Sequence, residues 1–129
     1  MSSAAPDARD CRVRTVVLVD DEPSFRQSLA EGLRDDGHEV LDYPSGASVP
    51  PFGTLPRDAI LLTDFDMPGA NGIELADAFR RVRPTGHAIL LSAYTIPAVD
   101  GAVAARPWLR FVSKPVDYET LHALIHQLW

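Results

Sequence analysis

The hydrophobic and polar residues of this chain alternate in blocks that predict five strands separated by helices. Short apolar runs of this kind are typical of strands buried on both faces of a parallel sheet. They lie at residues 13–19, 38–43, 59–62, 88–91 and 109–113. Apolar residues spaced three or four apart predict amphipathic helices after four of these strands. The helical stretches lie at residues 23–35, 73–82, 97–105 and 121–128.

The alternation is interrupted after the second strand. Pro50 and Pro51 stand where the next helix would lie, and adjacent prolines forbid more than about one turn of regular helix. We therefore expect a short or absent helix there, followed by an extended loop that ends at Pro56. The remaining alternation of strands and helices predicts the α/β class, with a doubly wound parallel sheet covered by helices on both faces.

Composition limits the kinds of function that the chain can have. Its 129 residues fit one domain, and we expect residues 1–12 to form a flexible tail before a domain at 13–129. The formal charge of −6 and the absence of a basic run argue against a nucleic-acid surface. No apolar run approaches the roughly 20 residues of a membrane span, and the start has no secretory signal pattern. A cytoplasmic location is therefore expected, with no membrane partner.

Polar residues follow four of the five strands, at the edge where parallel sheets bind ligands. They are Asp20, Asp21, Asp64, Ser92 and Lys114. Three neighbouring carboxylates repel one another, and Mg²⁺ relieves such repulsion because it prefers carboxylate and phosphate oxygens. An Asp beside this ion can act as a nucleophile toward phosphorus, while a Lys and a hydroxyl stabilise the transferred oxygens. The pattern therefore predicts a phosphoryl-accepting carboxylate.

Simpler interpretations exist for several of these residues. Asp64 is also explained if it merely ends a strand and caps the helix that starts near Gly72. His122 and His126 have the spacing of metal ligands on one helix, but they lie off its apolar stripe and no third ligand is evident from the sequence. A solvated helix face is therefore the favoured interpretation of this pair.

Taken together, the acidic pair after VVLV, Asp64 in LLTDFDMPGANG, Ser92, and Lys114 followed by proline resemble the receiver domain of two-component response regulators. The resemblance covers residues 13–129 and implies a flavodoxin-like sheet of order 2-1-3-4-5. It implies that Asp64 accepts a phosphoryl group, forming an aspartyl phosphate. It further implies that Asp20 and Asp21 hold Mg²⁺ together with Asp64 and the backbone carbonyl of Asp66.

The same resemblance implies a signalling switch rather than a turnover enzyme. Ser92 and Lys114 would move toward the phosphoryl oxygens, and Phe111 is at the position of the aromatic switch residue. Asp66 and Tyr94 are at positions that influence how fast the phosphoryl group is lost. The implied donor is a sensor histidine kinase or a phosphotransfer protein in a phosphorelay. A homodimer is a further option, the downstream target is unknown, and we expect no effector domain in this chain.

Two alternatives and one departure from the family pattern remain open. The residues Asp64-Phe65-Asp66 also fit a haloacid-dehalogenase-like Mg-dependent phosphatase, although Met67-Pro68 does not match the residues expected next. A phosphorylation-independent adaptor with the receiver fold is the second alternative. The departure is Arg106-Pro107-Trp108, which stands where the family usually has a Gly-Ala step before the fifth strand.

Overall fold

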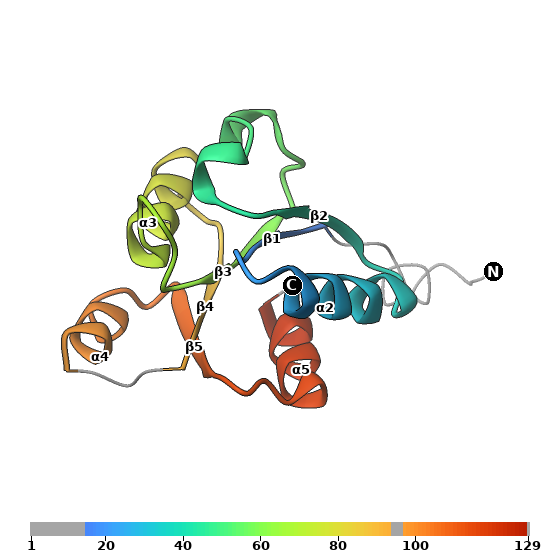
Figure 1. The fold of residues 1–129 in the computed structure, drawn as a ribbon. Coiled ribbons are helices and arrows are strands. Elements are labelled where there is room, and N and C mark those ends of the chain that lie inside the picture. The colour runs from blue at the N-terminus through green and yellow to red at the C-terminus, as the bar shows by residue number, and fades with distance from the viewer. Residues whose placement is uncertain (1–14, 94–96, 129) are drawn as a thin grey trace.

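The protein is an α/β domain built on one parallel sheet, seen in a computed structural model that describes residues 15–93 and 97–128 (Figure 1). In that part of the chain, five strands pair in the order β2-β1-β3-β4-β5, all parallel. They are β1 (Thr15–Val19), β2 (Glu39–Tyr43), β3 (Ile60–Asp64), β4 (Ala88–Ser92) and β5 (Leu109–Ser113). The predicted fold class and strand order are confirmed. The predicted tail at residues 1–12 lies outside the described residues.

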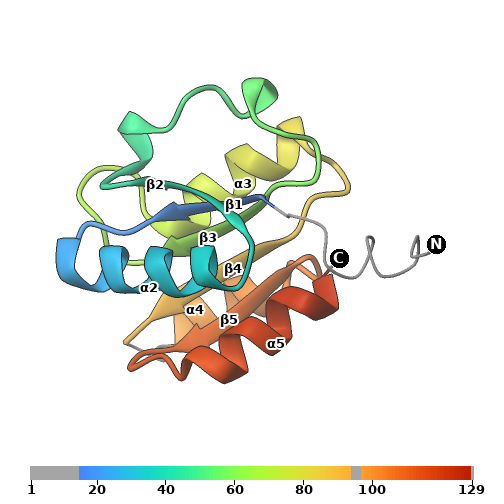
Figure 2. The same cartoon turned by 90° about the vertical axis from the view of Figure 1, so that its right-hand side faces the viewer.

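Helices cover both faces of the sheet. Helices α3 (Gly72–Val82) and α4 (Pro97–Ala104) lie on one face, and α2 (Pro23–Asp35) and α5 (Tyr118–Leu128) lie on the other (Figures 1 and 2). All four were predicted from the sequence, and α2, α3 and α5 were predicted from their apolar stripes. No helix in the described residues is both long and apolar enough to cross a lipid bilayer.

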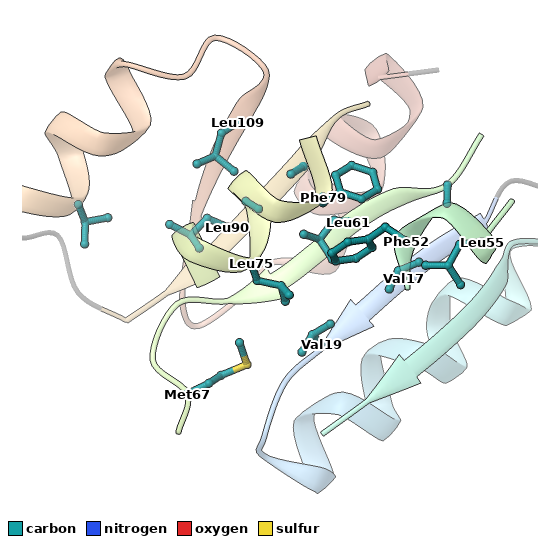
Figure 3. Close-up of a cluster of buried hydrophobic side chains, with 14 residues drawn as sticks. Val17, Val19, Phe52, Leu55, Leu61, Met67, Leu75, Phe79, Leu90 and Leu109 are labelled. Atoms are coloured by element: carbon teal, nitrogen blue, oxygen red, sulfur yellow. The ribbon is translucent and has the colours of Figure 1, made fainter. Parts of the chain in front are cut away.

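Alternating residues of the central strands build two separate cores. In β1, Val17 and Val19 face the core shared with α3, while Val16 and Leu18 face the core shared with α2 and α5. Figure 3 shows the first of these cores, where residues from β1, β3 and β4 meet α3. The three central strands are buried throughout, whereas the edge strands β2 and β5 are partly exposed. The sheet therefore holds the ends of β1, β3 and β4 rigidly beside one another.

No α-helix follows β2, as Pro50 and Pro51 predicted. The segment instead forms two 3₁₀ turns, η1 (Gly46–Ser48) and η2 (Phe52–Thr54). Phe52 is buried against Phe79 of α3, with the two rings edge to face at 5.3 Å. Arg83 donates a hydrogen bond of 2.7 Å to the carbonyl of Leu55, which fixes the end of the segment to α3. These contacts cover the face of the sheet that a regular helix would otherwise cover.

The Arg106-Pro107-Trp108 segment joins α3 to the start of β5. The Arg106 guanidinium donates two hydrogen bonds to the Asp77 carboxylate, at 2.7 and 2.8 Å, and a third to the carbonyl of Ala102. The guanidinium of Arg80 lies 5.3 Å from the centre of the Trp108 ring. A bidentate Arg–carboxylate pair is well oriented, so this departure from the family pattern provides a clamp between α3 and the α4–β5 connection.

Candidate functional site

The first part of the site is the turn that follows β1. The carboxylate of Asp20 is fully buried and accepts a hydrogen bond of 2.8 Å from the amide of Glu22. The amide of Asp20 donates to the carbonyl of Tyr43, and its own carbonyl accepts from Arg26. The next residue, Asp21, is exposed. The turn therefore holds one carboxylate inside the protein and presents the other at the surface.

The third acid of this turn has a structural role. The carboxylate of Glu22 accepts hydrogen bonds from the amides of Ser24 and Phe25, at 3.1 and 3.0 Å. It thereby caps the first turn of α2, whose first residue is Pro23. Because the Glu22 carboxylate is bonded to amides at the start of α2, the two acids of this turn that contribute to the site are Asp20 and Asp21.

Asp64 ends β3 and is held against the start of α3. Its side chain is buried, and β3 is paired on both sides by β1 and β4. A Cβ atom at Gly72 would collide with the backbone carbonyl of Asp64 and would lie 2.7 Å from Leu90. The Gly72 amide donates to the carbonyl of Phe65 at 3.0 Å. Only glycine lets the helix approach the end of the strand this closely, and that approach fixes the position of Asp64.

Asp64 does not cap α3, so the simpler interpretation of this residue is wrong. Asn71 is the cap: its side chain accepts from the amide of Glu74 at 2.9 Å, and the Glu74 carboxylate accepts from the amide of Asn71 at 2.8 Å. This reciprocal pair is a capping box. The carboxylate of Asp64 is therefore available for interactions in the site.

Lys114, directly after β5, pairs with the acids at the ends of β1 and β3. Its Nζ atom lies 3.1 Å from Asp20 Oδ2 and 3.1 Å from Asp64 Oδ1. The three residues come from the ends of β1, β3 and β5, and the structure brings them together as predicted. The Lys114 ammonium thus partly neutralises two buried carboxylates.

Phe25 is a part of the site that the sequence did not reveal. The centre of its ring lies 4.5 Å from Lys114 Nζ, within the range of a cation–π interaction. The sequence assigned Phe25 only to the apolar stripe of its helix, and no motif connects it with a lysine so far along the chain. The ring forms one wall beside the ammonium and restricts where Lys114 can move.

Burial and neighbouring charges shift the pKa values of Asp64 and Lys114. Burial raises the pKa of Asp64; Lys114 opposes that rise, and the charges of Asp20 and Asp21 add to it. Burial alone would lower the pKa of Lys114, but the hydrogen bonds and charges of Asp20 and Asp64 outweigh it and raise that pKa. The lysine is therefore firmly cationic, while the ionised form of Asp64 is disfavoured by its surroundings.

The acidic residues fit a divalent cation. Asp20, Asp21 and Asp64 each offer a carboxylate oxygen, and these atoms lie within 4.8 Å of one another. Two of these acids are buried and one is exposed, which leaves a side open to water. Mg²⁺ uses one or two carboxylates and keeps several waters, so this donor set suits it. The raised pKa of Asp64 is a second sign that negative charge in this pocket needs compensation.

The remaining predicted residues that the structure describes differ in their exposure. Ser92 ends β4, is buried, and its carbonyl accepts a hydrogen bond of 2.8 Å from the amide of Lys114. Phe111 in β5 is half-buried and packs against the core next to α3 and α4. Asp66 is exposed in the turn after β3. Tyr94 lies outside the described residues.

Comparison with known proteins gives a consistent family assignment. The family model of the response regulator receiver domain matches residues 16–126. The chain is 34% identical over 104 residues to the response regulator receiver protein Anae109_2439 of Anaeromyxobacter sp. (strain Fw109-5), covering 81% of this chain and 44% of that protein. It is 25% identical over 113 residues to the transcriptional regulator NtrC of Azospirillum brasilense, covering 88% of this chain and 24% of that protein. The chain therefore spans less than half of each relative.

Solved structures agree with this assignment. Chemotaxis protein CheY4 of Vibrio cholerae superposes with a TM-score of 0.80 at 25% identity, covering 91% of this chain and 99% of that one. The response regulator TrrA of Thermotoga maritima, crystallised with Mg²⁺ and BeF, gives a TM-score of 0.76 at 28% identity, covering 90% of this chain and 99% of that one. The family-model match, the fold and the acidic pocket agree: this chain belongs to the response regulator receiver domain family.

Proposed function

We propose that Asp64 accepts a phosphoryl group from a phosphohistidine of a sensor histidine kinase or a phosphotransfer protein. An Oδ atom of Asp64 attacks phosphorus, an O–P bond forms and the N–P bond of the donor breaks. The electron pair stays on the donor imidazole, which takes up a proton from solvent. The observation that carries this proposal is the position of Lys114, 3.1 Å from both Asp20 and Asp64, beside three clustered carboxylates.

Receiver domains are signalling switches that bind Mg²⁺ in their acidic pocket. In this chain Asp20, Asp21 and Asp64 would hold the ion, together with the backbone carbonyl of Asp66. The ion supplies positive charge to the oxygens of the incoming phosphoryl group. Asp20 also anchors Lys114, and Lys114 orients the Asp64 carboxylate and then pairs with the transferred oxygens.

The output is a shift between two packings of the β4 and β5 ends. The Ser92 hydroxyl donates to the phosphoryl group, and the half-buried ring of Phe111 turns inward. Phosphorylation thereby favours one of two conformations that already exist. Asp66 and Tyr94 tune how long this state lasts, so Tyr94→Ala is expected to shorten the lifetime of the phosphorylated protein. An unchanged decay rate would remove Tyr94 from this role.

The direct test is labelling with acetyl phosphate and Mg²⁺, followed by mass spectrometry of the intact protein. The wild type is expected to gain one phosphoryl group, and Asp64→Asn none. The matched control is Asp66→Asn, two residues away in the same loop, which keeps its backbone carbonyl and is expected to be labelled. Stoichiometric labelling of Asp64→Asn at another residue would refute the assignment.

Labelling combined with assays of phosphate-ester hydrolysis and of Mg²⁺ binding separates the two alternatives from the switch. Continuous hydrolysis of a phosphate ester, with no stable phosphorylated protein, would favour a haloacid-dehalogenase-like phosphatase. Failure to bind Mg²⁺ and to be labelled would favour an adaptor that works without phosphorylation. Labelling does not test the cytoplasmic location, the downstream target or a homodimer. Localisation experiments test the first of these, and interaction experiments test the other two.

A further inference from the structure

Three of the four histidines of the chain meet at one place. His122 and His126 lie one turn apart on α5, and His38 directly precedes β2. One ring nitrogen of each lies within 4.8 Å of the others. The His38 and His122 rings are joined by a contact of 3.1 Å between their Nε2 atoms. His38 is therefore the third candidate ligand that was not evident from the sequence. It is 84 residues from His122 along the chain.

The separation of these nitrogens suits a shared metal ion. Two imidazoles bound tetrahedrally to Zn²⁺ at about 2.0–2.1 Å place their nitrogens about 3.3 Å apart. The His38 and His122 Nε2 atoms are already at 3.1 Å. The His122 and His126 rings are nearly perpendicular, with centres 4.5 Å apart, and the His38 ring is edge-on to both. Binding requires side-chain rotations that direct the three nitrogens, already within 4.8 Å of one another, at one point.

A carboxylate lies beside the His122 ring. Asp36 Oδ2 is 3.7 Å from His122 Nε2, and the same oxygen accepts a hydrogen bond from the Tyr118 hydroxyl. The Tyr118 ring stacks on His122, with the ring planes 11° apart. Tyr118 thus orients both Asp36 and His122. Groups that hold metal ligands in place in this way strengthen metal sites.

This cluster is separate from the acidic pocket. Asp20, Asp64 and Lys114 follow the carboxyl ends of their strands, whereas His38 precedes the first residue of β2. The two donor sets also differ in chemistry. Carboxylates and water suit Mg²⁺, whereas imidazole suits Zn²⁺, Cu²⁺ and Ni²⁺.

We propose that His38, His122 and His126 bind one divalent transition-metal ion of the class that prefers imidazole, with Zn²⁺ as its representative. The His38 side chain is buried, His122 is half-buried and His126 is exposed, so the site opens to solvent on one side. The ion links the α2–β2 connection to α5.

The test is a Zn²⁺ titration of the full chain without an affinity tag, in competition with a chromogenic chelator. A Cys11→Ser background removes the single thiol as a ligand, and saturating Mg²⁺ occupies the acidic pocket. One Zn²⁺ per chain is expected to bind. His38→Gln and His126→Gln are each expected to weaken binding by at least about tenfold, since ligand loss costs no less than loss of a supporting residue.

The matched control is His87→Gln, which changes the one histidine outside the cluster and is expected to leave Zn²⁺ affinity unchanged. NMR of the wild-type histidine rings gives a second measurement that needs no variant. Zn²⁺ is expected to shift the ring signals of His38, His122 and His126, and not those of His87. The proposal is overturned if Mg²⁺ displaces the Zn²⁺, if His38→Gln binds like the wild type, or if the His38 ring does not shift.

Discussion

At the scale of single residues, the site combines burial and charge in a way that costs stability. Asp64 is buried beside two further carboxylates, and among the described residues Lys114 is the cation that pairs with Asp20 and Asp64. This arrangement is unfavourable to the isolated domain, and under the proposed function it prepares the domain for a cation and a phosphoryl group. Function and stability therefore make opposite demands on Asp64.

We predict that Asp64→Asn stabilises the domain at neutral pH when Mg²⁺ is absent. The pKa of Asp64 is raised above its ordinary value of 3.8 in the folded state, mainly by burial. As pH rises above 3.8, the unfolded chain releases this proton first, so the wild type loses stability relative to a neutral side chain.

Urea unfolding at pH 7 and near pH 3.5 measures this effect. The advantage of Asp64→Asn should be present at pH 7 and mostly lost at the lower pH, where Asp64 is mainly protonated in both states. Asp66→Asn, an exposed control, should stay within about 0.5 kcal/mol of the wild type. Equal stability of Asp64→Asn and wild type at pH 7 would contradict the burial argument.

A second prediction compares two glycines in helices. Gly72→Ala is expected to destabilise the domain by about 1–3 kcal/mol, because its Cβ would press on the Asp64 carbonyl and on Leu90. Gly101→Ala in α4 is expected to stabilise it by about 0.5–1 kcal/mol, because no atom lies within 4 Å of the added Cβ and alanine favours the helix. Chemical denaturation of both variants measures the two effects. A loss of stability in Gly101→Ala, or none in Gly72→Ala, would count against the packing described here.

At the scale of elements, the regular strands and helices could be predicted because their periodicity is local. The five apolar runs and the helical stripes are each contained in a short window of sequence. The effect of Pro50 and Pro51 was equally local, so the absent helix was predictable too. What replaces that helix was not, since the contact between Phe52 and Phe79 depends on tertiary packing.

The clamp between Arg106 and Asp77 is the element-scale contact that can be tested. Both side chains are partly exposed, so we expect a coupling of about 0.5–1 kcal/mol in a double-mutant cycle of Arg106→Ala and Asp77→Ala. The hydrogen bond from Arg106 lowers the pKa of Asp77. The stabilisation is therefore complete above the ordinary value of 3.8 and is lost as pH falls through the lowered value.

Urea unfolding of the four proteins at pH 7 and in acid gives the coupling at each pH. Arg26 and Asp42, an ion pair at 3.1 Å between α2 and β2, provide a comparison away from this clamp. A coupling between Arg106 and Asp77 that is unchanged in strong acid would mean that the pair stabilises through packing and not through charge.

At the scale of the whole molecule, the acidic pocket was predictable and the histidine cluster was not. A parallel sheet brings the carboxyl ends of its strands to one edge, so residues that directly follow strands were expected to meet. His38 follows no such rule, because its approach to α5 depends on how the α2–β2 connection packs. The contact between Phe25 and Lys114 was not predicted either, because it also depends on tertiary packing.

The divalent cation of the acidic pocket should stabilise the whole fold. A ligand present at 100 times its dissociation constant adds about 2.7 kcal/mol to the free energy of unfolding. Mg²⁺ is therefore expected to raise the Tm of the wild type, and EDTA to reverse the rise. Asp21→Asn, which changes the exposed acid of the pocket, should abolish most of the shift.

Differential scanning fluorimetry with increasing Mg²⁺ measures this shift. Glu22→Gln is the matched control, because Glu22 belongs to the same turn but its carboxylate caps α2. It is expected to lower the Tm somewhat and to keep the Mg²⁺-dependent rise. A wild-type Tm that does not respond to Mg²⁺ would contradict the cation site.

The amide of Lys114 donates a hydrogen bond to the carbonyl of Ser92, so the last residue of β4 and the first residue after β5 are joined by their main chains. If the proposed phosphoryl group draws in either residue, we expect this hydrogen bond to pass main-chain displacement from one to the other. We therefore expect the ends of β4 and β5 to change position together. A partner that binds this edge of the proposed switch would then meet one joint change and not two separate ones.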